Sequence, residues 1–332
     1  MRRAKILNDP RDVVNEALEG LVAASHGELR PIDGTTAVVR SQLAASRIGL
    51  LIGGGSGHEP LFAGFVGEGL ADAAACGNVF AAPTPDIILA ATRAVDRGKG
   101  VLYVYGNYAG DNLSFDMAAE LAAAEGISTA TVRVWDDVAA APPERMNDRR
   151  GIAGDLFVIK VAGAACTAAE TLDEARAIAV RARDNTRSIG VAVAPGSIPE
   201  TGKPTFELDD DEIEIGMGLH GEPGVARAKL GRADPLIADM LGRILADLPF
   251  ASGDDVCLLV NDLGSTTWME LLVATRKAHA VLDAAGIQVH DTVVGSFCTS
   301  QEMAGLSLTL MKLDQELERC YDAPARSAAF TR

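Results

Sequence analysis

Short apolar runs alternate with longer segments of helical periodicity along most of this chain. The strands expected from compact apolar runs are 48–52, 101–105, 128–134, 189–194, 213–218, 256–261, 288–294 and 306–311. The helices expected from apolar residues spaced three and four apart are 11–24, 86–95, 113–124, 156–169, 172–183, 235–247 and 266–284. Strands that alternate with helices indicate a layered α/β fold.

A length of 332 residues favours two domains, because single hydrophobic cores seldom grow beyond about 250–300 residues. The polar stretch 184–187 is the expected boundary, which gives an N-terminal domain at 1–184 and a C-terminal domain at 185–332. Consecutive strands are more frequent after this boundary. We therefore expect a mixed sheet, rather than a purely parallel one, in the second domain.

The composition is that of a soluble globular protein, with 48% apolar and 23% charged residues. A net charge of −16 argues against binding to nucleic acid or to an anionic membrane, since either would need a basic face. The start of the chain, Met1–Ile6, leads into polar sequence and does not resemble a signal peptide. No apolar run is long enough to span a bilayer.

The five cysteines are far apart in the sequence and show no metal-binding spacing: Cys76, Cys166, Cys257, Cys298 and Cys320. Most lie in apolar runs, which predicts buried, inert thiols and fits a reducing cytoplasm. The acidic run 209–212 is expected to be a solvated turn, because a metal site needs spaced oxygens that converge on one point. We predict no metal in this chain.

Two segments place a histidine among glycines, beside a glutamate and a proline. They are Gly53–Pro60, which contains His58, and Leu219–Gly224, which contains His220. Glycine lets the main chain bend sharply beside an uncrowded imidazole, and imidazole is the side chain best suited to exchanging protons near neutral pH. If both segments line one cleft, the chain carries a two-histidine site.

The glycine-rich segment does not fit the known nucleotide-binding patterns. Gly53–Gly57 does not match G-x-G-x-x-G in any register, and the chain has no Walker sequence, which disfavours a nicotinamide-dependent dehydrogenase. Ser56 is not in a nucleophile elbow. The segment is either a loop whose N–H groups and Ser56 hydroxyl meet a small polar ligand or a tight structural turn.

Two further candidates also have structural interpretations. Asp111 follows the expected strand 101–105, and it either serves a ligand or caps the helix expected near Leu113. His220 either serves a ligand or is satisfied by a backbone partner. The expected positions of His58, Asp111 and His220, shortly after the carboxyl ends of strands, favour ligand binding in an open α/β sheet.

In six segments the chain resembles the dihydroxyacetone kinase family, and specifically its substrate-binding K subunit (DhaK-type). These segments are Gly53–Pro60, Pro83–Asp86, Asn107–Asp111, Arg149–Gly151, Gly218–Gly224 and Cys298–Gly305. The motifs occur in the expected order over nearly the whole chain. The resemblance implies a homodimer of two-domain α/β subunits, with a three-layer α/β/α N-terminal domain, that binds a short ketose.

The resemblance also implies roles for individual residues. His220 matches the histidine that forms a covalent hemiaminal with the ketose carbonyl, a bond that excludes glycerol because glycerol has no carbonyl group. His58 matches the general base, and Asp111 matches the acid at the same hydroxyl. The loop residues Gly55, Ser56 and Gly57 match contacts to the ligand.

The family places nucleotide binding on a separate helical L module, which holds Mg²⁺ on the phosphates. The resemblance therefore implies no cofactor in this chain. It also implies a partner L subunit that carries ATP, or ADP recharged by a phosphotransferase-system protein.

The chain departs from the family pattern at one ligand contact. The family's typical loop has Lys and Thr where this chain has Gly106 and Ala109. Loss of the lysine removes a cationic donor and is expected to leave space for a larger ketose, such as a four-carbon erythrulose-like sugar. The alternative to an enzyme is a non-catalytic ketose-binding or regulatory module, which the presence of His58, Asp111 and His220 disfavours.

Overall fold

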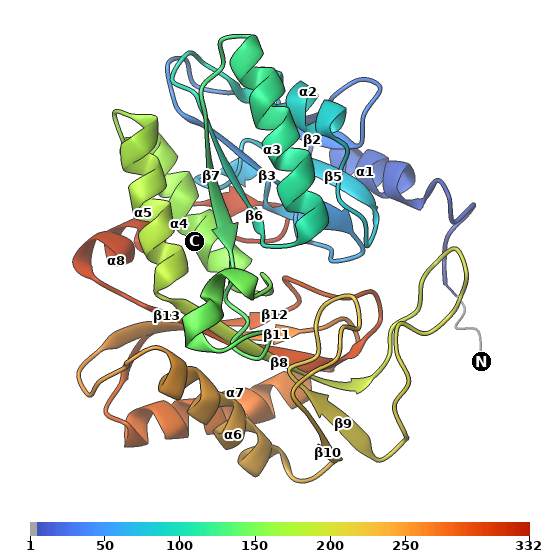
Figure 1. Ribbon diagram of the computed structural model, residues 1–332, viewed down its shortest axis with the longest axis vertical. Helices are drawn as coiled ribbons and strands as arrows, with labels where there is room; N and C mark the ends of the chain where they lie inside the picture. Colours follow the sequence, from blue (N-terminus) through green and yellow to red (C-terminus); the bar gives the residue numbers. More distant parts are fainter. Residues whose placement is uncertain (1–4) are drawn as a thin grey trace. The chain divides into compact units, whose positions relative to one another are not determined.

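The computed structural model describes residues 5–332 and consists of two compact units, each built on a six-stranded sheet (Figure 1). Within the described residues, the N-terminal unit comprises 5–134, 155–183 and 317–332, and the C-terminal unit comprises 135–154 and 184–316. Both units are built from separate segments of the chain. From the sequence we expected two contiguous domains, at 1–184 and 185–332.

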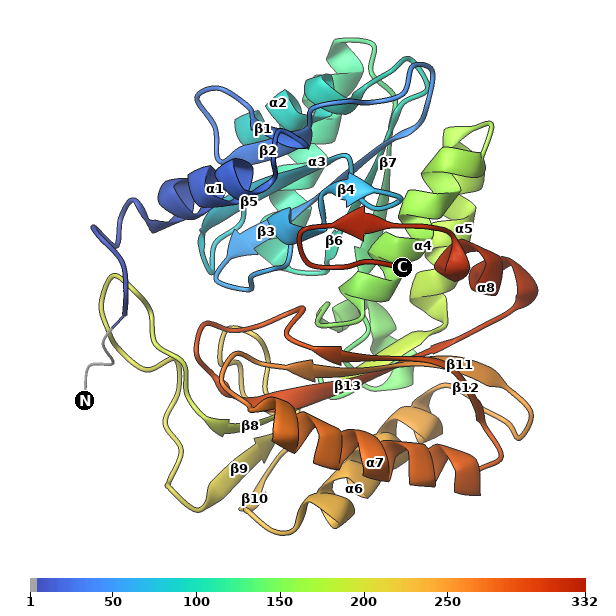
Figure 2. The ribbon, with the colours of Figure 1, turned by 180° about the vertical axis from the view of Figure 1, so that it is seen from behind.

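The sheet of the N-terminal unit has the strand order β1-β2-β5-β3-β6-β7. Its strands are β1 (Leu29–Pro31), β2 (Ala37–Arg40), β3 (Gly49–Ser56), β5 (Ala73–Val79), β6 (Val101–Gly106) and β7 (Thr129–Val134). Strands β5, β3, β6 and β7 run parallel, and β1 and β2 add an antiparallel edge. A separate pair joins β4 (Gly67–Glu68) to β14 (Arg326–Ser327), so the end of the chain lies beside β4 (Figure 2).

Helices cover both faces of this sheet. They are α1 (Val13–Ala24), α2 (Pro85–Val95), α3 (Ala109–Ala124), α4 (Asp155–Ala168) and α5 (Leu172–Asp184), with α8 (Gln315–Asp322) and the short 3₁₀ turn η1 (Ala63–Phe65). Tyr103 and Tyr105 both contact Phe115 of α3, so the alternate side chains of β6 point to the opposite face. A Cβ on Gly106 would meet Asp155 of α4 there. The expected three-layer α/β/α arrangement is confirmed.

Helix α4 is buried on every side over its first twelve residues, from Asp155 to Cys166. A Cβ at Gly163 would lie 2.5 Å from the Gly69 carbonyl oxygen, so this glycine allows the helix to approach the backbone after β4. Lys160 is buried in the same helix and donates a hydrogen bond of 2.8 Å to the Cys320 carbonyl. Burial lowers the pKa of Lys160 to about 8.

The sheet of the C-terminal unit has the order β10-β9-β8-β13-β11-β12. Its strands are β8 (Thr186–Ala194), β9 (Glu212–Ile215), β10 (Ala226–Lys229), β11 (Asp255–Asp262), β12 (Gln288–Gly295) and β13 (Ala304–Lys312). The β11–β12 pair is parallel and the other pairs are antiparallel, which confirms the predicted mixed sheet. A short 3₁₀ segment, η2 (Pro143–Asp148), precedes Arg149.

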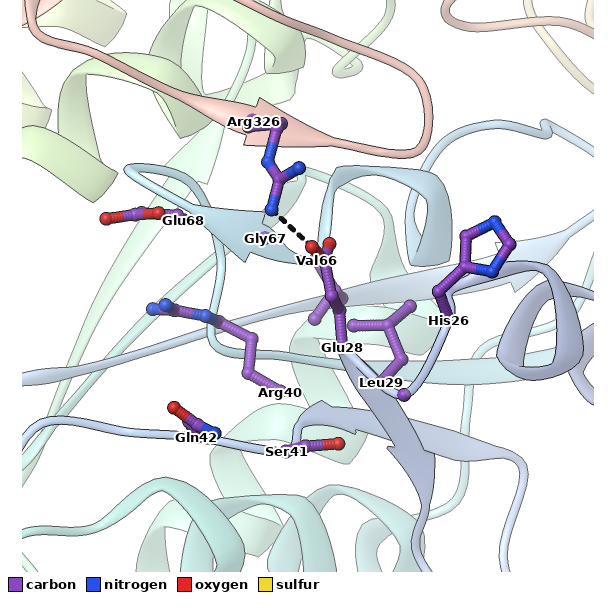
Figure 3. Close-up of a pocket in the computed structure, with 11 residues that line it drawn as sticks. His26, Glu28, Leu29, Arg40, Ser41, Gln42, Val66, Gly67, Glu68 and Arg326 are labelled. Carbon is purple, nitrogen blue, oxygen red and sulfur yellow. Dashed lines mark hydrogen bonds and ion pairs between the residues drawn. The ribbon is translucent and has the colours of Figure 1, made fainter.

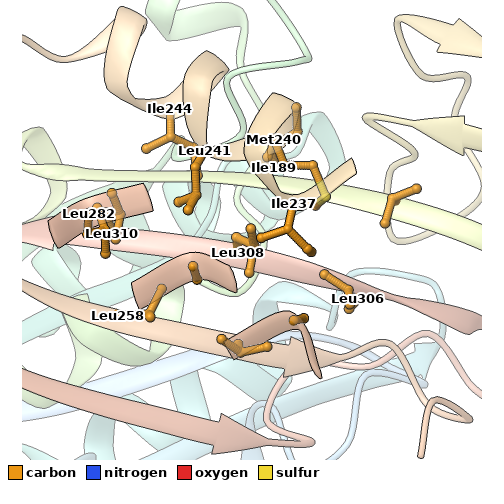
Figure 4. Close-up of a cluster of buried hydrophobic side chains, with 14 of the residues drawn as sticks. Ile189, Ile237, Met240, Leu241, Ile244, Leu258, Leu282, Leu306, Leu308 and Leu310 are labelled. Atoms are coloured by element: carbon orange, nitrogen blue, oxygen red, sulfur yellow. The ribbon is translucent and has the colours of Figure 1, made fainter. Parts of the chain in front are cut away.

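Helices α6 (Ala233–Asp247) and α7 (Trp268–Ala284) lie side by side on one face of this sheet (Figure 1). Their apolar faces meet β8, β11 and β13 in a core that includes Ile189, Ile237, Leu241, Leu258 and Leu308 (Figure 4). Every one of these side chains is almost fully excluded from water, so the core holds both helices on the sheet.

Each helix and strand expected from the sequence is present, but the strands β1, β2, β4, β5, β10 and β14, the helix α8 and the 3₁₀ segments η1 and η2 were not predicted. β5 begins Ala73-Ala74-Ala75-Cys76-Gly77, a composition with low strand propensity. It is nevertheless a buried strand between β2 and β3, because tertiary burial overrides local preference.

All five cysteines lie within the described residues and are free and buried, as predicted. Burial raises the pKa of the Cys76 thiol to about 12 and raises that of Cys166 further. These thiols are therefore protonated at neutral pH and chemically inert. Across residues 5–332, no helix combines the length and the apolar character needed to cross a membrane.

A buried ion cluster joins three parts of the C-terminal unit. Asp247, the last residue of α6, accepts hydrogen bonds from Arg149 and from Arg187 of β8. The Arg149 side chain is completely buried, and Arg187 also packs over the Trp135 ring. One carboxylate is thus shared by two buried guanidinium groups.

Replacing Asp247 with Ala is expected to destabilise the protein by about 3–5 kcal/mol, since it leaves two buried cations without their shared anion. Urea unfolding measures this loss. The control is Asp239→Ala, which removes an exposed partner of Arg243 within α6 and is expected to cost less than about 1 kcal/mol. Equal losses for the two variants would contradict the role given to Asp247.

Candidate functional site

The glycines at the end of β3 are packed against the protein's own atoms. A Cβ at Gly53 would lie 2.4 Å from the Ala75 carbonyl oxygen, and one at Gly55 would lie 2.9 Å from the Ala81 nitrogen. Gly57 has φ +102, and a Cβ there would lie 2.8 Å from the Phe80 ring. Glycine is therefore required at these three positions for close packing. This agrees with the interpretation of the segment as a tight structural turn.

Two polar groups of the same loop already have partners within the protein. The buried Ser56 hydroxyl donates to the Gly77 carbonyl at 2.7 Å. The Gly57 N–H donates to the Glu59 carboxylate, at 3.1 and 3.0 Å to its two oxygens. These two donors are therefore occupied by partners within the protein.

His58 follows this turn and is 3% exposed. Its ring lies 5.1 Å from the Phe80 ring, centroid to centroid. Phe80 adopts a left-handed backbone conformation with φ 58, which is unusual for a bulky residue and is often associated with functional sites. Burial raises the pKa of the neighbouring Glu59 carboxyl, and the hydrogen bond from the Gly57 N–H opposes this effect.

Asp111 lies inside helix α3 and does not cap it. The helix begins at Ala109, with Tyr108 as its N-cap residue, so Asp111 is the third helical residue. The expectation of a helix starting near Leu113, with Asp111 as a possible cap, was therefore wrong. Asp111 is 9% exposed and lies in the first turn, where the helix dipole favours a negative charge.

The sheet brings His58 and Asp111 to the same edge. β3 and β6 are neighbouring parallel strands, with Leu51 opposite Tyr103 and Ile52 opposite Val104. His58 follows the carboxyl end of β3, and Asp111 follows the carboxyl end of β6. An imidazole and a carboxylate at this edge form a set of groups that can bind a hydroxyl and move its proton.

Gly106 is the last residue of β6, and the volume directly beside it is filled. A Cβ there would lie 3.3 Å from the Asp155 Oδ2 atom and 3.3 Å from the Tyr108 ring, tighter than an ordinary contact. We expected the absence of the family's lysine side chain to leave open space beside Gly106. The structure contradicts this at the Cβ position, where Asp155 and Tyr108 already lie close. Instead, the glycine allows the buried Asp155 carboxylate to approach the strand end.

His220 belongs to the C-terminal unit, in a tight turn after β9. The Gly221 N–H donates to the Gly218 carbonyl at 3.1 Å, and the buried Ser300 hydroxyl donates to the Leu219 carbonyl. The imidazole Nδ1 lies 3.1 Å from Glu222 Oε1, and the His220 side chain is 27% exposed. The structural alternative for His220 was a ring held by a backbone group. At Nδ1 the partner is instead the Glu222 carboxylate.

The contacts of Glu59, Phe80, Asp155 and Glu222 could not be predicted from the sequence. Glu59 and Glu222 were visible in the two histidine motifs, but the sequence could not show that one binds a backbone N–H and the other an imidazole. Asp155 is far from Gly106 in sequence, and only the packing of α4 on β6 brings them together.

A polar pocket of about 350 Å³ lies elsewhere in the N-terminal unit (Figure 3). Its lining includes His26, Glu28, Arg40, Glu68 and Arg326, and Arg326 forms an ion pair with Glu28 across it. Arg40 is paired with the buried Asp72. The charges in this pocket largely neutralise one another, and none of the predicted site residues lines it.

Comparison with known proteins identifies the fold. The crystal structure of the dihydroxyacetone kinase of C. freundii matches the whole of this chain with a TM-score of 0.91 at 30% identity, and this chain covers 60% of that chain. A dihydroxyacetone kinase operon co-activator, Dha-DhaQ, matches 97% of this chain and 98% of its own, with a TM-score of 0.89 at 31% identity. The chain therefore has the fold of the dihydroxyacetone kinases and their close relatives.

Sequence similarity defines the family. The Dak1 domain model matches residues 19–329, so the chain belongs to the Dak1 domain family. A "PTS-dependent dihydroxyacetone kinase 1, dihydroxyacetone-binding subunit DhaK" of Listeria innocua is 44% identical over 94% of this chain and 95% of its own length. An "L-erythrulose 1-kinase" of Mycolicibacterium smegmatis is 43% identical over 98% of this chain, which covers 58% of that protein.

Replacing Gly53 with Ala is expected to destabilise the protein by about 1–3 kcal/mol, because the new methyl group meets a backbone carbonyl oxygen that cannot move freely. Gly20 in α1 is the matched control, since a Cβ there has no neighbour within 4 Å. Gly20→Ala is expected to stabilise the helix by about 0.5–1 kcal/mol. Urea unfolding of both variants measures the two changes in stability. A Gly53→Ala variant as stable as the wild type would refute the requirement for glycine against the Ala75 carbonyl.

Proposed function

We propose that this chain is the ketose-binding subunit of a dihydroxyacetone-kinase-type phosphotransferase. The observation that carries the proposal is the 44% identity to a dihydroxyacetone-binding subunit over almost the full length of both chains. The two histidine turns and Asp111 are consistent with it. We also propose that the subunit is a cytoplasmic homodimer.

In the proposed mechanism His220 traps the ketose. The Nε2 lone pair forms a bond to the carbonyl carbon, and the carbonyl π electrons move to the oxygen, which takes a proton. The imidazole loses its Nδ1 proton, so the product is a neutral hemiaminal and no atom leaves. A polyol without a carbonyl group cannot form this bond, so the chemistry itself selects ketoses.

His58 and Asp111 act on the hydroxyl to be phosphorylated. Asp111 accepts a hydrogen bond from this hydroxyl, and His58 removes its proton as the oxygen attacks phosphorus. His58 is buried against Phe80, which limits the ring's orientations and shields it from water. Gly55, Ser56 and Gly57 shape the loop around the ligand.

The phosphoryl donor comes from a partner in this proposal. Within the described residues, the glycine-rich loop is filled by its own packing and its Gly57 N–H is occupied, which supports a nucleotide site elsewhere. The related C. freundii kinase has been crystallised with AMP-PNP and Mg²⁺, and this chain covers 61% of that chain. We propose that an L-type subunit supplies the nucleotide and Mg²⁺, either as ATP or as ADP recharged by a phosphotransferase-system protein.

The roles of the two histidines can be separated by substitution. With a partner L subunit present, His58→Ala is expected to lower turnover by at least about 100-fold, because the base is lost, while the ketose adduct still forms. His220→Ala is expected to lose the adduct itself, seen by intact mass spectrometry as absence of the added ketose mass. His279→Ala is the control. This histidine of α7 is exposed, and its ring contacts the Thr292 hydroxyl of β12. Unchanged turnover in His58→Ala would refute its role as the base.

The substrate is proposed to be a ketose larger than dihydroxyacetone, such as a four-carbon erythrulose-like sugar. At the end of β6 the chain has Gly106, and the Asp155 carboxylate approaches where a family lysine would begin. A hydrogen-bond acceptor thus replaces a cationic donor, which suits an additional substrate hydroxyl. The 43% identity to an L-erythrulose 1-kinase supports this choice.

The test compares kcat/KM for L-erythrulose and dihydroxyacetone with the same L partner. We expect the wild-type chain to prefer L-erythrulose by about 10-fold or more, and Asp155→Asn to reduce that preference because the amide is a weaker acceptor. A clear preference of the wild type for dihydroxyacetone would overturn the proposed substrate but not the ketose-binding function.

A second candidate function is a ketose-binding regulatory module without catalysis. It is favoured by the full-length match to the Dha-DhaQ co-activator, at a TM-score of 0.89 and 31% identity. Both candidates form the adduct at His220, so adduct formation does not separate them. Ketose-dependent turnover with an L partner separates them, because a purely regulatory module gives none.

A further inference from the structure

The turn that carries His220 folds back on itself and returns Glu222 to the histidine. The Gly218 N–H donates to the Glu222 carbonyl at 3.1 Å, and Gly221 has φ +84, a conformation that glycine adopts without strain. Two residues after the histidine, a carboxylate therefore lies over the same turn.

The Glu222 carboxylate contacts both the backbone and the ring of His220. Oε2 accepts the His220 backbone N–H at 2.9 Å, and Oε1 lies 3.1 Å from the ring Nδ1. An ionised carboxylate can only accept hydrogen bonds, so Nδ1 must carry the proton and donate it. The neutral ring then has its lone pair on Nε2.

The charge on Glu222 is maintained by its surroundings. Burial acts to raise the pKa of this carboxyl, but the hydrogen bonds that it accepts, from the His220 side chain above all, and the nearby charge of Arg150 outweigh burial and lower the pKa to about 2. Glu222 is therefore ionised throughout the neutral pH range.

Arg150 is itself fixed in the C-terminal unit. Its guanidinium donates to Asp137 Oδ2 at 2.7 and 3.1 Å and to the Gly216 carbonyl at 3.2 Å. Its Nη1 atom lies 3.9 Å from Glu222 Oε2. The buried Asp137 thus holds Arg150, and the positive charge of Arg150 faces Glu222.

Gly218 makes room for this arrangement. A Cβ at this position would lie 2.2 Å from Glu222 Oε2 and 2.4 Å from Arg150 Nη1. Any other residue would force the carboxylate or the guanidinium away. Gly218 is therefore needed to leave room for the Glu222 carboxylate and the Arg150 guanidinium, in addition to any effect on the backbone turn.

We propose that Glu222 is a positioning residue for His220, and that Arg150 and Gly218 hold it in place. Glu222 fixes the Nδ1–H form of the ring, so that Nε2 is the atom that adds to a ketose carbonyl. As the Nε2–C bond forms, the ring becomes an imidazolium whose Nδ1–H the ionised Glu222 carboxylate accepts and stabilises; the ring then loses this proton to solvent, while the former carbonyl oxygen takes a proton from solvent. The adduct step rests on the proposed function; the choice of tautomer does not.

The test uses the full chain and the isosteric variant Glu222→Gln. Nitrogen-15 chemical shifts of the His220 ring, assigned by their loss in His220→Asn, report the tautomer directly. Wild type is expected to show a protonated Nδ1, and Glu222→Gln is expected to lose this preference. The rate of adduct formation with L-erythrulose, followed by intact mass spectrometry, is expected to fall roughly 10- to 100-fold.

Glu200→Gln is the matched control, because Glu200 is an exposed glutamate on the loop after β8. Gly218→Ala is the second variant: it keeps Glu222 but displaces its carboxylate, and it should slow adduct formation as well. Wild-type tautomer and wild-type rate in Glu222→Gln would overturn the inference. If the wild type forms no adduct with any ketose, the proposed function fails, and the ring shifts still decide whether Glu222 sets the tautomer.

Discussion

Close backbone packing at the carboxyl end of β3 is the constraint on which the position of His58 depends. Gly53 lies against the Ala75 carbonyl of β5, and Gly57 lies under the Phe80 ring that also contacts His58. A side chain at Gly53 would force β3 away from β5, and one at Gly57 would meet the Phe80 ring. The position of His58 thus depends on the steric fit of the loop within the protein.

The two histidine motifs look alike in sequence but differ in what their glutamates do. Glu59 accepts the Gly57 N–H, which stabilises the turn. Glu222 accepts from the backbone and the ring of His220. Similar local sequences therefore place one histidine against an aromatic ring and the other against a carboxylate, in line with the different chemistry proposed for each.

Periodicity predicted the long helices and buried strands because their apolar patterns record local geometry. β5 escaped prediction, since Ala73-Ala74-Ala75 forms a strand only through its neighbours. Motifs identified His58, Asp111 and His220 as candidates, but the sequence does not contain the contacts that orient them. Asp155 near Gly106 and Arg150 near Glu222 are brought together by the fold, so no local pattern could have shown either.

The approach of Asp155 to Gly106 has a consequence for how this site can change over time. Because a side chain at position 106 would press on Asp155 and Tyr108, the two ends of this contact cannot mutate independently. A lysine acquired first would meet a buried carboxylate, whereas loss of that carboxylate first would open room for it. Substitutions at positions 106 and 155 are therefore coupled, and their effects on stability and substrate choice do not simply add.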